Sequence, residues 1–151
     1  KSTRVMSLRD GTKKMSKSDA SNYSRILMTD SNDEIKSKIK KAKTDSMNMP
    51  SDEKNLSDRP EINNLINIYS ASMAIEKKEV INQFASKEIS FFKNELTDVL
   101  ISIIEPIASE TIKLLDNKNY LENILVDGAN KAQVISNKSI SEVYEIIGLS
   151  R

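Results

Sequence analysis

Apolar positions recur at the spacing of an α-helix over most of the chain. From Glu61 onward, isoleucine, leucine, valine and aromatic residues return every three or four positions, as they do on one face of a helix. The spacing predicts helices over residues 61–73, 76–85 and 89–114, and a last one from residue 121 to 135 or on to 147. Pro106 is expected to kink the third, because proline removes a backbone donor. Gly148 is expected to end the last helix.

The residues before Glu61 follow a different pattern. Short alternating or apolar runs over 4–8 and 24–28 predict two short strands. The polar stretch between them predicts a turn and a surface loop, in which Gly11 is expected to allow movement. Several potential N-caps at 30–33, followed by Ile35, Ile39 and Ala42 on one face, predict a helix. Residues 44–60 are polar, contain Pro50 and Pro60, and predict a connector.

These elements predict a mainly α fold with three regions. A strand-and-loop segment covers residues 1–30, a basic helix and connector cover 31–60, and a bundle of about four long helices covers 61–151. Each apolar stripe is interpreted as a surface that packs into a core, because that is what amphipathic helices mainly do.

Composition narrows the chemistry. The chain has no cysteine and no histidine, which excludes disulfides and every nucleophile that relies on a histidine base. The net charge of +1 combines +7 over residues 1–43 with −6 over the remainder, so the N-terminal region suits a polyanion. No apolar run is long enough to span a membrane, and no metal-ligand set is identified. Because the first residue is Lys1 rather than Met, we expect a fragment.

One segment carries a recognisable pattern for chemistry. Lys14-Met15-Ser16-Lys17-Ser18 places two lysines three positions apart among small and polar residues. Ammonium groups can follow a moving triphosphate as point charges, with little demand on angle. On spacing alone, a solvated basic loop is an equal interpretation.

The surroundings of this segment resemble class I aminoacyl-tRNA synthetases, and specifically the tryptophanyl enzymes. The match extends over nearly the whole chain in order, through Arg4–Asp19 with its KMSKS sequence, Ile35–Ser46, Arg59–Tyr69 and Leu125–Ala132. The tyrosyl enzymes are close siblings, but their loop usually departs from Met-Ser in the middle.

The resemblance implies a tryptophan–tRNA ligase. Such an enzyme forms tryptophanyl-adenylate from tryptophan and ATP with Mg²⁺ as a substrate complex, and it needs no permanently bound cofactor. It then transfers tryptophan to tRNA(Trp). The resemblance assigns Lys14 and Lys17 as catalytic residues. It assigns ATP contacts to Val5, Lys14, Met15, Ser16, Lys17 and Ser18.

The resemblance also implies what lies elsewhere. The Rossmann-like α/β catalytic domain, with the tryptophan pocket and the dimer contacts, is expected upstream, so residues 1–30 would be its end and 61–151 an anticodon-binding domain. The chain alone is therefore expected to be inactive. A bacterial cytoplasm is the expected location, with an organelle as the alternative. Three other interpretations stay open: a stand-alone tRNA-binding or structural helical domain that keeps a relic loop, a tyrosyl enzyme, and an unrelated helical bundle with a basic arm.

Overall fold

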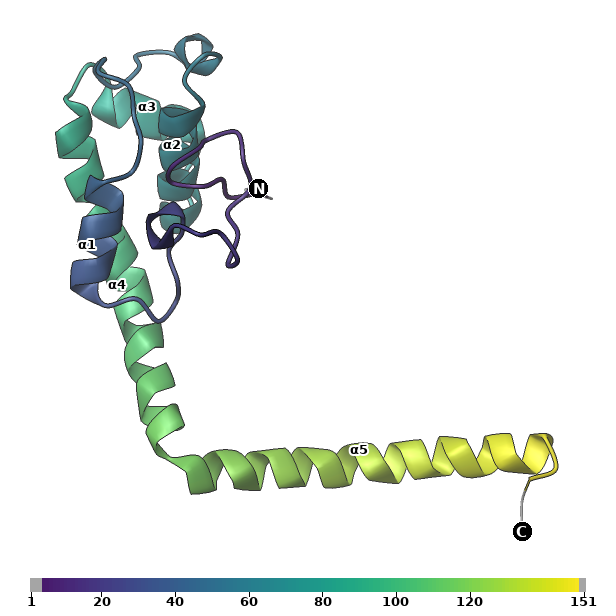
Figure 1. Ribbon diagram of the computed structural model, residues 1–151. Helices are drawn as coiled ribbons and strands as arrows, with labels where there is room; N and C mark the ends of the chain where they lie inside the picture. Colours follow the sequence, from purple (N-terminus) through teal and green to yellow (C-terminus); the bar gives the residue numbers. More distant parts are fainter. Residues whose placement is uncertain (1–3, 150–151) are drawn as a thin grey trace. The chain divides into compact units, whose positions relative to one another are not determined.

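The computed structural model describes residues 4–149, and within that range it is mainly helical. Five α-helices are found there: α1 (Asn32–Lys40), α2 (Pro60–Met73), α3 (Lys77–Phe84), α4 (Ile89–Asp116) and α5 (Lys118–Ile146) (Figure 1). Two short 3₁₀ helices cover Asn22–Ser24 and Glu53–Leu56. The chain divides into two compact units, one ending at Ser109 and one beginning at Glu110. The predicted mainly α class is confirmed.

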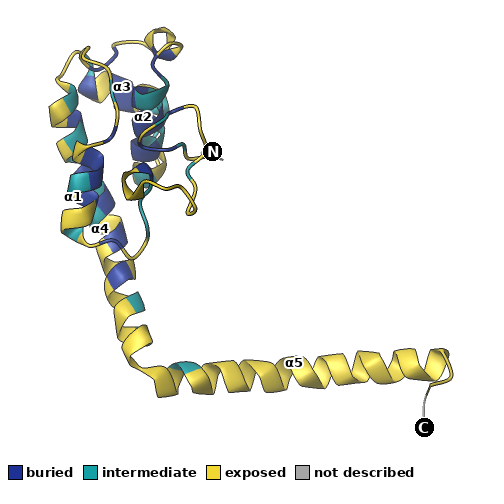
Figure 2. Cartoon of the chain, in the orientation of Figure 1, coloured by how far each residue is buried: buried dark blue, intermediate teal, exposed yellow. Residues whose placement is uncertain are grey.

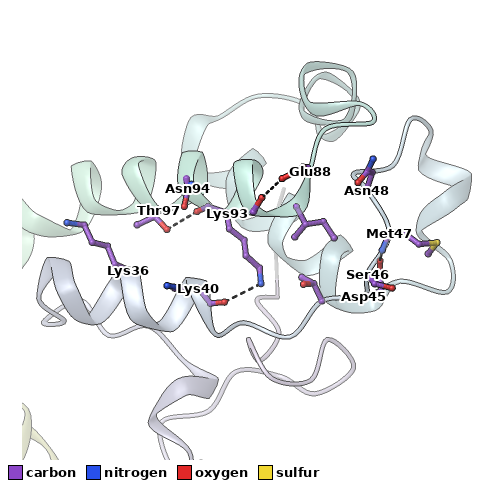
Figure 3. Close-up of a pocket in the computed structure, with 13 residues that line it drawn as sticks. Lys36, Lys40, Asp45, Ser46, Met47, Asn48, Glu88, Lys93, Asn94 and Thr97 are labelled. Carbon is purple, nitrogen blue, oxygen red and sulfur yellow. Dashed lines mark hydrogen bonds between the residues drawn. The ribbon is translucent and has the colours of Figure 1, made fainter.

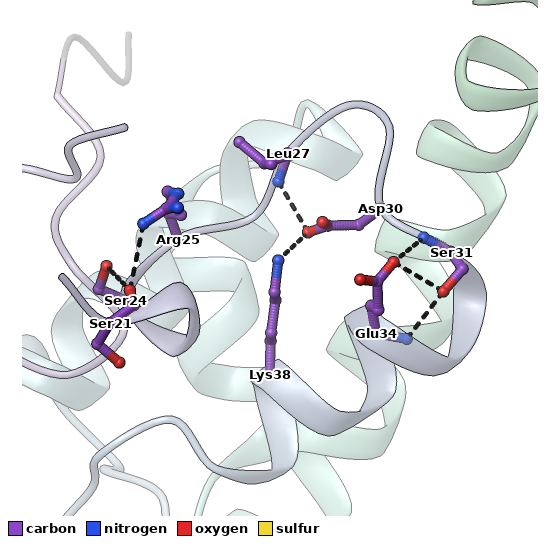
Figure 4. A network of polar contacts seen from close by, with 8 residues as sticks. All are labelled: Ser21, Ser24, Arg25, Leu27, Asp30, Ser31, Glu34 and Lys38. Carbon is purple, nitrogen blue, oxygen red and sulfur yellow. Dashed lines mark hydrogen bonds and ion pairs between the residues drawn. The ribbon is translucent and has the colours of Figure 1, made fainter. Parts of the chain in front are cut away.

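The start of α1 is fixed by polar contacts that its sequence supplies (Figure 4). The Ser31 hydroxyl accepts from the Glu34 backbone N–H, and the Glu34 carboxylate accepts in return from the Ser31 backbone N–H at 2.8 Å. This reciprocal capping box satisfies two donors that a helix start would otherwise leave free. Beside it, Lys38 Nζ donates to Asp30 Oδ2 at 2.5 Å, and both side chains are less than 5% exposed.

The core of the first unit lies among α1, α2, α3 and the first turns of α4 (Figure 2). Tyr69, Phe84 and Phe92 meet at its centre, with ring centroids 4.9 to 5.7 Å apart in tilted and edge-to-face arrangements. Pro60 is the first residue of α2, where the missing N–H costs nothing. The sequence had suggested it only as a breaker. Pro106 lies inside α4 without ending it, and its kink stays a prediction.

The two short strands expected before Ser31 are not formed. Within residues 4–149 the structure has one isolated antiparallel bridge, between Met6 and Lys14, and the predicted run at 24–28 has no ladder. A strand forms when one neighbouring segment hydrogen-bonds along its length, whereas the backbone groups of residues 6–8 bond to several different segments. The Leu8 N–H donates to the Ser24 carbonyl, and the Leu8 carbonyl accepts from the Lys43 N–H.

The second unit contains the end of α4 and all of α5. As expected, α5 ends just before Gly148, whose φ is +71°. The Leu149 N–H donates to the Tyr144 carbonyl, and the Gly148 N–H donates to the Glu145 carbonyl, which is a Schellman motif. The interpretation of the last apolar stripe as core was wrong for the described residues, because α5 carries no buried residue. Within residues 4–149, no helix combines the length and the apolarity that crossing a bilayer requires.

Candidate functional site

The Lys14–Ser18 segment extends from a short root made of two backbone pieces, residues 5–7 and 13–15. The Ser7 N–H donates to the Lys13 carbonyl at 2.8 Å, and the Met15 N–H donates to the Val5 carbonyl at 3.1 Å. These bonds flank the bridge between Met6 and Lys14. Lys14 therefore sits where the loop leaves its root.

Helix α2 closes the other edge of this root through a side chain that sequence reasoning missed. Asn64 Oδ1 accepts from the Met6 N–H at 2.9 Å, and Asn64 Nδ2 donates to the Met6 carbonyl, also at 2.9 Å. The same Nδ2 lies 3.4 Å from the Ser7 carbonyl. The amide thus pairs with Met6 as a neighbouring strand would. Because these residues are 58 positions apart, no local spacing could have indicated the contact.

Gly11, between the two pieces of the root, lies directly against the first turn of α2. A Cβ built on Gly11 would come within 2.5 Å of backbone atoms of Pro60 and Glu61. Backbone atoms cannot move aside as a flexible side-chain end can. The close approach to α2 therefore requires a glycine at this position, and the loop mobility that the sequence suggested stays a prediction.

The turn that precedes the loop is held by Asp10. Its carboxylate accepts from the Thr12 hydroxyl at 2.6 Å and from the Thr12 N–H at 3.0 Å. These hydrogen bonds, first the one from the hydroxyl, lower the pKa of Asp10 to about 2. Lys13 Nζ lies 3.3 Å from the same carboxylate, so Lys13 is directed to the turn rather than to the loop.

The loop itself is exposed except at Met15. The Met15 side chain is half-buried and packs against the hydrophobic core. Beyond it, Ser16 Oγ lies 3.0 Å from Ser18 Oγ and accepts from the Ser18 N–H at 3.3 Å. Lys14 and Lys17 are exposed, and among residues 4–149 neither side chain forms an ion pair.

Of the ATP contacts expected from the sequence, five lie together in the loop and Val5 lies in its root. Val5 is 39% exposed, and its carbonyl is taken by Met15. The arrangement provides two free ammonium groups on a short polar segment, with serine hydroxyls between them. It can bind a polyphosphate, but within the described residues it holds no histidine and no nucleophile–base pair. The roles of the six residues stay predictions.

A second feature is an open cavity of about 860 Å³ between α1, residues 44–48 and the start of α4 (Figure 3). Lys36, Lys40 and Lys93 lie along it. Lys93 Nζ donates to the Ala42 carbonyl at 2.7 Å, and partial burial, followed by the charge of Arg9, lowers the pKa of Lys93. The other two lysines are exposed and belong to the basic face that the sequence predicts for α1.

The turn at residues 44–46 that borders this cavity is held from the start of α2. Arg59 binds Asp45 with two hydrogen bonds, Nε to Oδ2 at 2.7 Å and Nη2 to Oδ1 at 2.8 Å. Arg59 Nη2 also donates to the Asn48 carbonyl at 3.0 Å. Burial alone would raise the pKa of Asp45, but the Arg59 hydrogen bonds, the hydrogen bond from the Met47 N–H and the Arg59 charge together outweigh it and hold that pKa below its usual value.

A short basic loop rooted on an α-helical unit is an arrangement that can hold a phosphate-bearing molecule. The sequence pattern of the family described as "tRNA synthetases class I (W and Y)" matches residues 2–105. The chain belongs to this family, and the sequence-based recognition is confirmed.

Individual relatives agree with the family. A tryptophan–tRNA ligase of Agrobacterium fabrum is 44% identical over 148 residues, which are 98% of this chain and 42% of the relative. One from Rickettsia felis is 44% identical over 97% of this chain and 44% of its own length. The chain therefore spans less than half the length of these curated relatives.

Solved structures give the same result for the fold. Tryptophanyl-tRNA synthetase from Mycoplasma pneumoniae matches with a TM-score of 0.71 and 27% identity, over 98% of this chain and 46% of that one. The enzyme from Campylobacter jejuni also gives a TM-score of 0.71, over 98% of this chain and 44% of that one. Its identity of 24% makes it a comparison of fold alone.

Proposed function

We propose that this chain is a C-terminal portion of a tryptophan–tRNA ligase, and that it carries the KMSKS loop and a helical region that contacts tRNA(Trp). The observation that supports this best is the position of the loop. Lys14 and Lys17 project from a root bonded to α2, in a chain 44% identical to a tryptophan–tRNA ligase over 98% of its length.

In this proposal the loop acts on ATP during amino-acid activation. The tryptophan carboxylate attacks the α-phosphate of ATP, and tryptophanyl-adenylate forms. Pyrophosphate leaves, and the oxygen that had bridged the α- and β-phosphates takes up negative charge. Lys14 and Lys17 meet that charge when the loop closes, which stabilises the transition state. Magnesium enters with ATP as part of the substrate. Met15 keeps the loop attached to the core while the exposed part moves.

The proposed partner is tRNA(Trp). The lysines along the cavity of Figure 3 and the excess of positive charge over residues 1–43 suit an RNA backbone. A second domain upstream would supply the tryptophan pocket and the contacts of a homodimer. Because the relatives are bacterial proteins that bear the name of a translation enzyme, we propose the bacterial cytoplasm as its location.

A stand-alone tRNA-binding domain with a relic loop is the second candidate function, and the net charge of +7 over residues 1–43 favours it as an RNA-binding alternative. Tyrosine as substrate is less favoured, because the relatives named here are tryptophan enzymes.

The test is amino-acid-dependent ATP–pyrophosphate exchange by the full-length protein that contains this chain. We expect exchange with tryptophan and none with tyrosine, and we expect the 151-residue chain alone to give none. Orientation of ATP against a bound amino acid supplies much of the rate, and a loop alone cannot provide it. Exchange by the isolated chain at the full-length rate would contradict the fragment proposal. Absence of exchange by the full-length protein would leave the binding domain as the better candidate.

A further inference from the structure

We propose that Asn64 is a positioning residue for the KMSKS loop, so that α2 sets the place from which Lys14 and Lys17 reach ATP. The inference rests on the proposed function for its effect on catalysis, although the contact itself does not depend on it. Asn64 would not touch the nucleotide. It would act by holding Met6, the residue across the bridge from Lys14.

The contact is specific for an amide. The Met6 N–H can only donate and the Met6 carbonyl can only accept, so the side chain that pairs with both must present one oxygen and one N–H. Asn64 does so at 2.9 Å in each direction and is 3% exposed. A carboxylate would place an acceptor against the Met6 carbonyl, and an alkyl group would leave two part-buried backbone groups without partners.

The effect on the loop follows from the path of hydrogen bonds. Asn64 holds the backbone of Met6. The hydrogen bonds of the residues on either side of Met6, from the Ser7 N–H and to the Val5 carbonyl, then hold the backbone at Lys13 and Met15. Those two residues flank Lys14. Among the described residues, the hydrogen bonds of Ser16 to Ser18 stay within this segment and the adjacent Asp19, so this part is free to close while its base stays in register.

Burial alone is not a sufficient explanation for an asparagine at this position. The neighbouring core positions of α2 are Ile62, Leu65, Ile66 and Ile68, and a leucine would add apolar area to that core at less cost in desolvation. The amide is used where the root of the loop lies against the helix. Gly11 makes the second close approach, one turn earlier on the same helix.

The first experiment measures the contact in the 151-residue chain by amide hydrogen exchange. Asn64→Leu should speed exchange at the Met6 and Met15 amides by about tenfold or more, while the Ile35 amide in α1 keeps its rate. The control is Asn67→Leu, a half-buried asparagine about one turn further along α2 that makes no hydrogen bond to the root within the described residues. Unchanged Met6 and Met15 rates would overturn the proposal, and so would an equal rise at Ile35.

The second experiment uses the full-length enzyme and pre-steady-state adenylate formation. Asn64→Leu should lower the rate of the chemical step by about 10- to 100-fold, as small misplacements of reacting groups do, with little change in ATP affinity. In a Lys14→Ala/Lys17→Ala background the same substitution should have almost no further effect, because its influence passes through these two lysines. A residue that only stabilised the fold would lower the rate equally in both backgrounds, and that result would overturn the inference.

If Asn64→Leu does not fold, Asn64→Asp is carried through both measurements, because it keeps an acceptor for the Met6 N–H and replaces the donor to the Met6 carbonyl with a second acceptor. The two experiments also fail separately. If the wild-type protein makes no adenylate, the proposed function is wrong, but exchange at Met6 and Met15 still decides whether Asn64 holds the root.

Discussion

The ion pair between Asp30 and Lys38 allows a quantitative test of what stabilises the first unit (Figure 4). Asp30 Oδ2 also accepts from the Leu27 N–H at 2.8 Å. The substitution Asp30→Asn keeps a side-chain oxygen that can accept this hydrogen bond. What the substitution removes is the negative charge beside Lys38 Nζ. The Lys38 side chain is 3% exposed, so its ammonium group would stay buried without its ion-pair partner.

Removing one partner of a buried pair typically costs about 3 to 5 kcal/mol, because the other charge is left uncompensated. Since the Leu27 hydrogen bond is kept, we expect Asp30→Asn to cost about 3 kcal/mol, at the lower end of that range. For a unit of this size the loss corresponds to a fall of about 10 °C in Tm. It is a large share of a total stability of about 5 to 15 kcal/mol.

The double variant sharpens the prediction. Adding Lys38→Met to Asp30→Asn removes the stranded charge and keeps a flexible chain of similar length in the same space. We therefore expect the second substitution to restore about 2 kcal/mol, since apolar replacement of a whole buried pair is often neutral. Lys36→Met is the matched control on the same helix. Lys36 is 59% exposed and 3.9 Å from Asp33, so its loss should change stability by less than about 0.5 kcal/mol.

The assay is urea denaturation of the chain followed by far-UV circular dichroism, with the slope of each transition compared to confirm that the same surface unfolds. A cost below about 1 kcal/mol for Asp30→Asn would refute the reasoning, since that is what exposed pairs are worth. So would a double variant less stable than Asp30→Asn alone.

Three further predictions test the loop and its surroundings. Lys17→Ala in the full-length enzyme should slow adenylate formation about a hundredfold, the usual cost of one transition-state contact, with ATP affinity nearly unchanged in an ATP titration; weaker binding at an unchanged rate would make the loop only a clamp. Gly11→Ala should cost about 1 to 3 kcal/mol in urea denaturation because its Cβ meets the α2 backbone, whereas Gly128→Ala, in open space within α5, should be neutral or stabilising by up to about 1 kcal/mol. Thr12→Val should raise the pKa of Asp10 from about 2 toward 3.8 in an NMR titration; because folding lowers this pKa, the stability that wild type gains over the variant should be full above pH 3.8 and should vanish as the pH falls toward 2.

The parts of the fold that the sequence predicted well are those with local causes. The helical period located α3, α4 and α5, and one of the N-caps expected at 30–33, Ser31, begins α1. The five residues of the KMSKS sequence were found in the same way, because they are contiguous.

The parts that failed depend on residues distant in sequence. Alternation over residues 4–8 indicated a strand, but whether a strand forms depends on its partners, and here Asn64, Ser24 and Lys43 share the edge. The close approach of Gly11 to the start of α2 could not be predicted either, because it joins segments that are distant in the sequence. The apolar stripe of α5 shows the opposite limit. Apolar residues that recur about every 3.6 positions indicate a helix with an apolar face, but they do not establish that the same chain buries that face.

The first turns of α2 connect the two candidate features of the first unit. Arg59 holds the turn at Asp45 beside the cavity, Pro60 lies against Gly11, and Asn64 holds Met6 at the root of the loop. All three contacts come from one helix start, the N-cap and first five residues of α2, whose backbone fixes these residues relative to one another. The start of α2 therefore fixes the loop root and the cavity-lining turn relative to each other. Shifting or fraying the start of α2 would disturb both, whereas a substitution in the exposed part of the loop, such as Lys17→Ala, would leave Asp45 and its contacts unchanged.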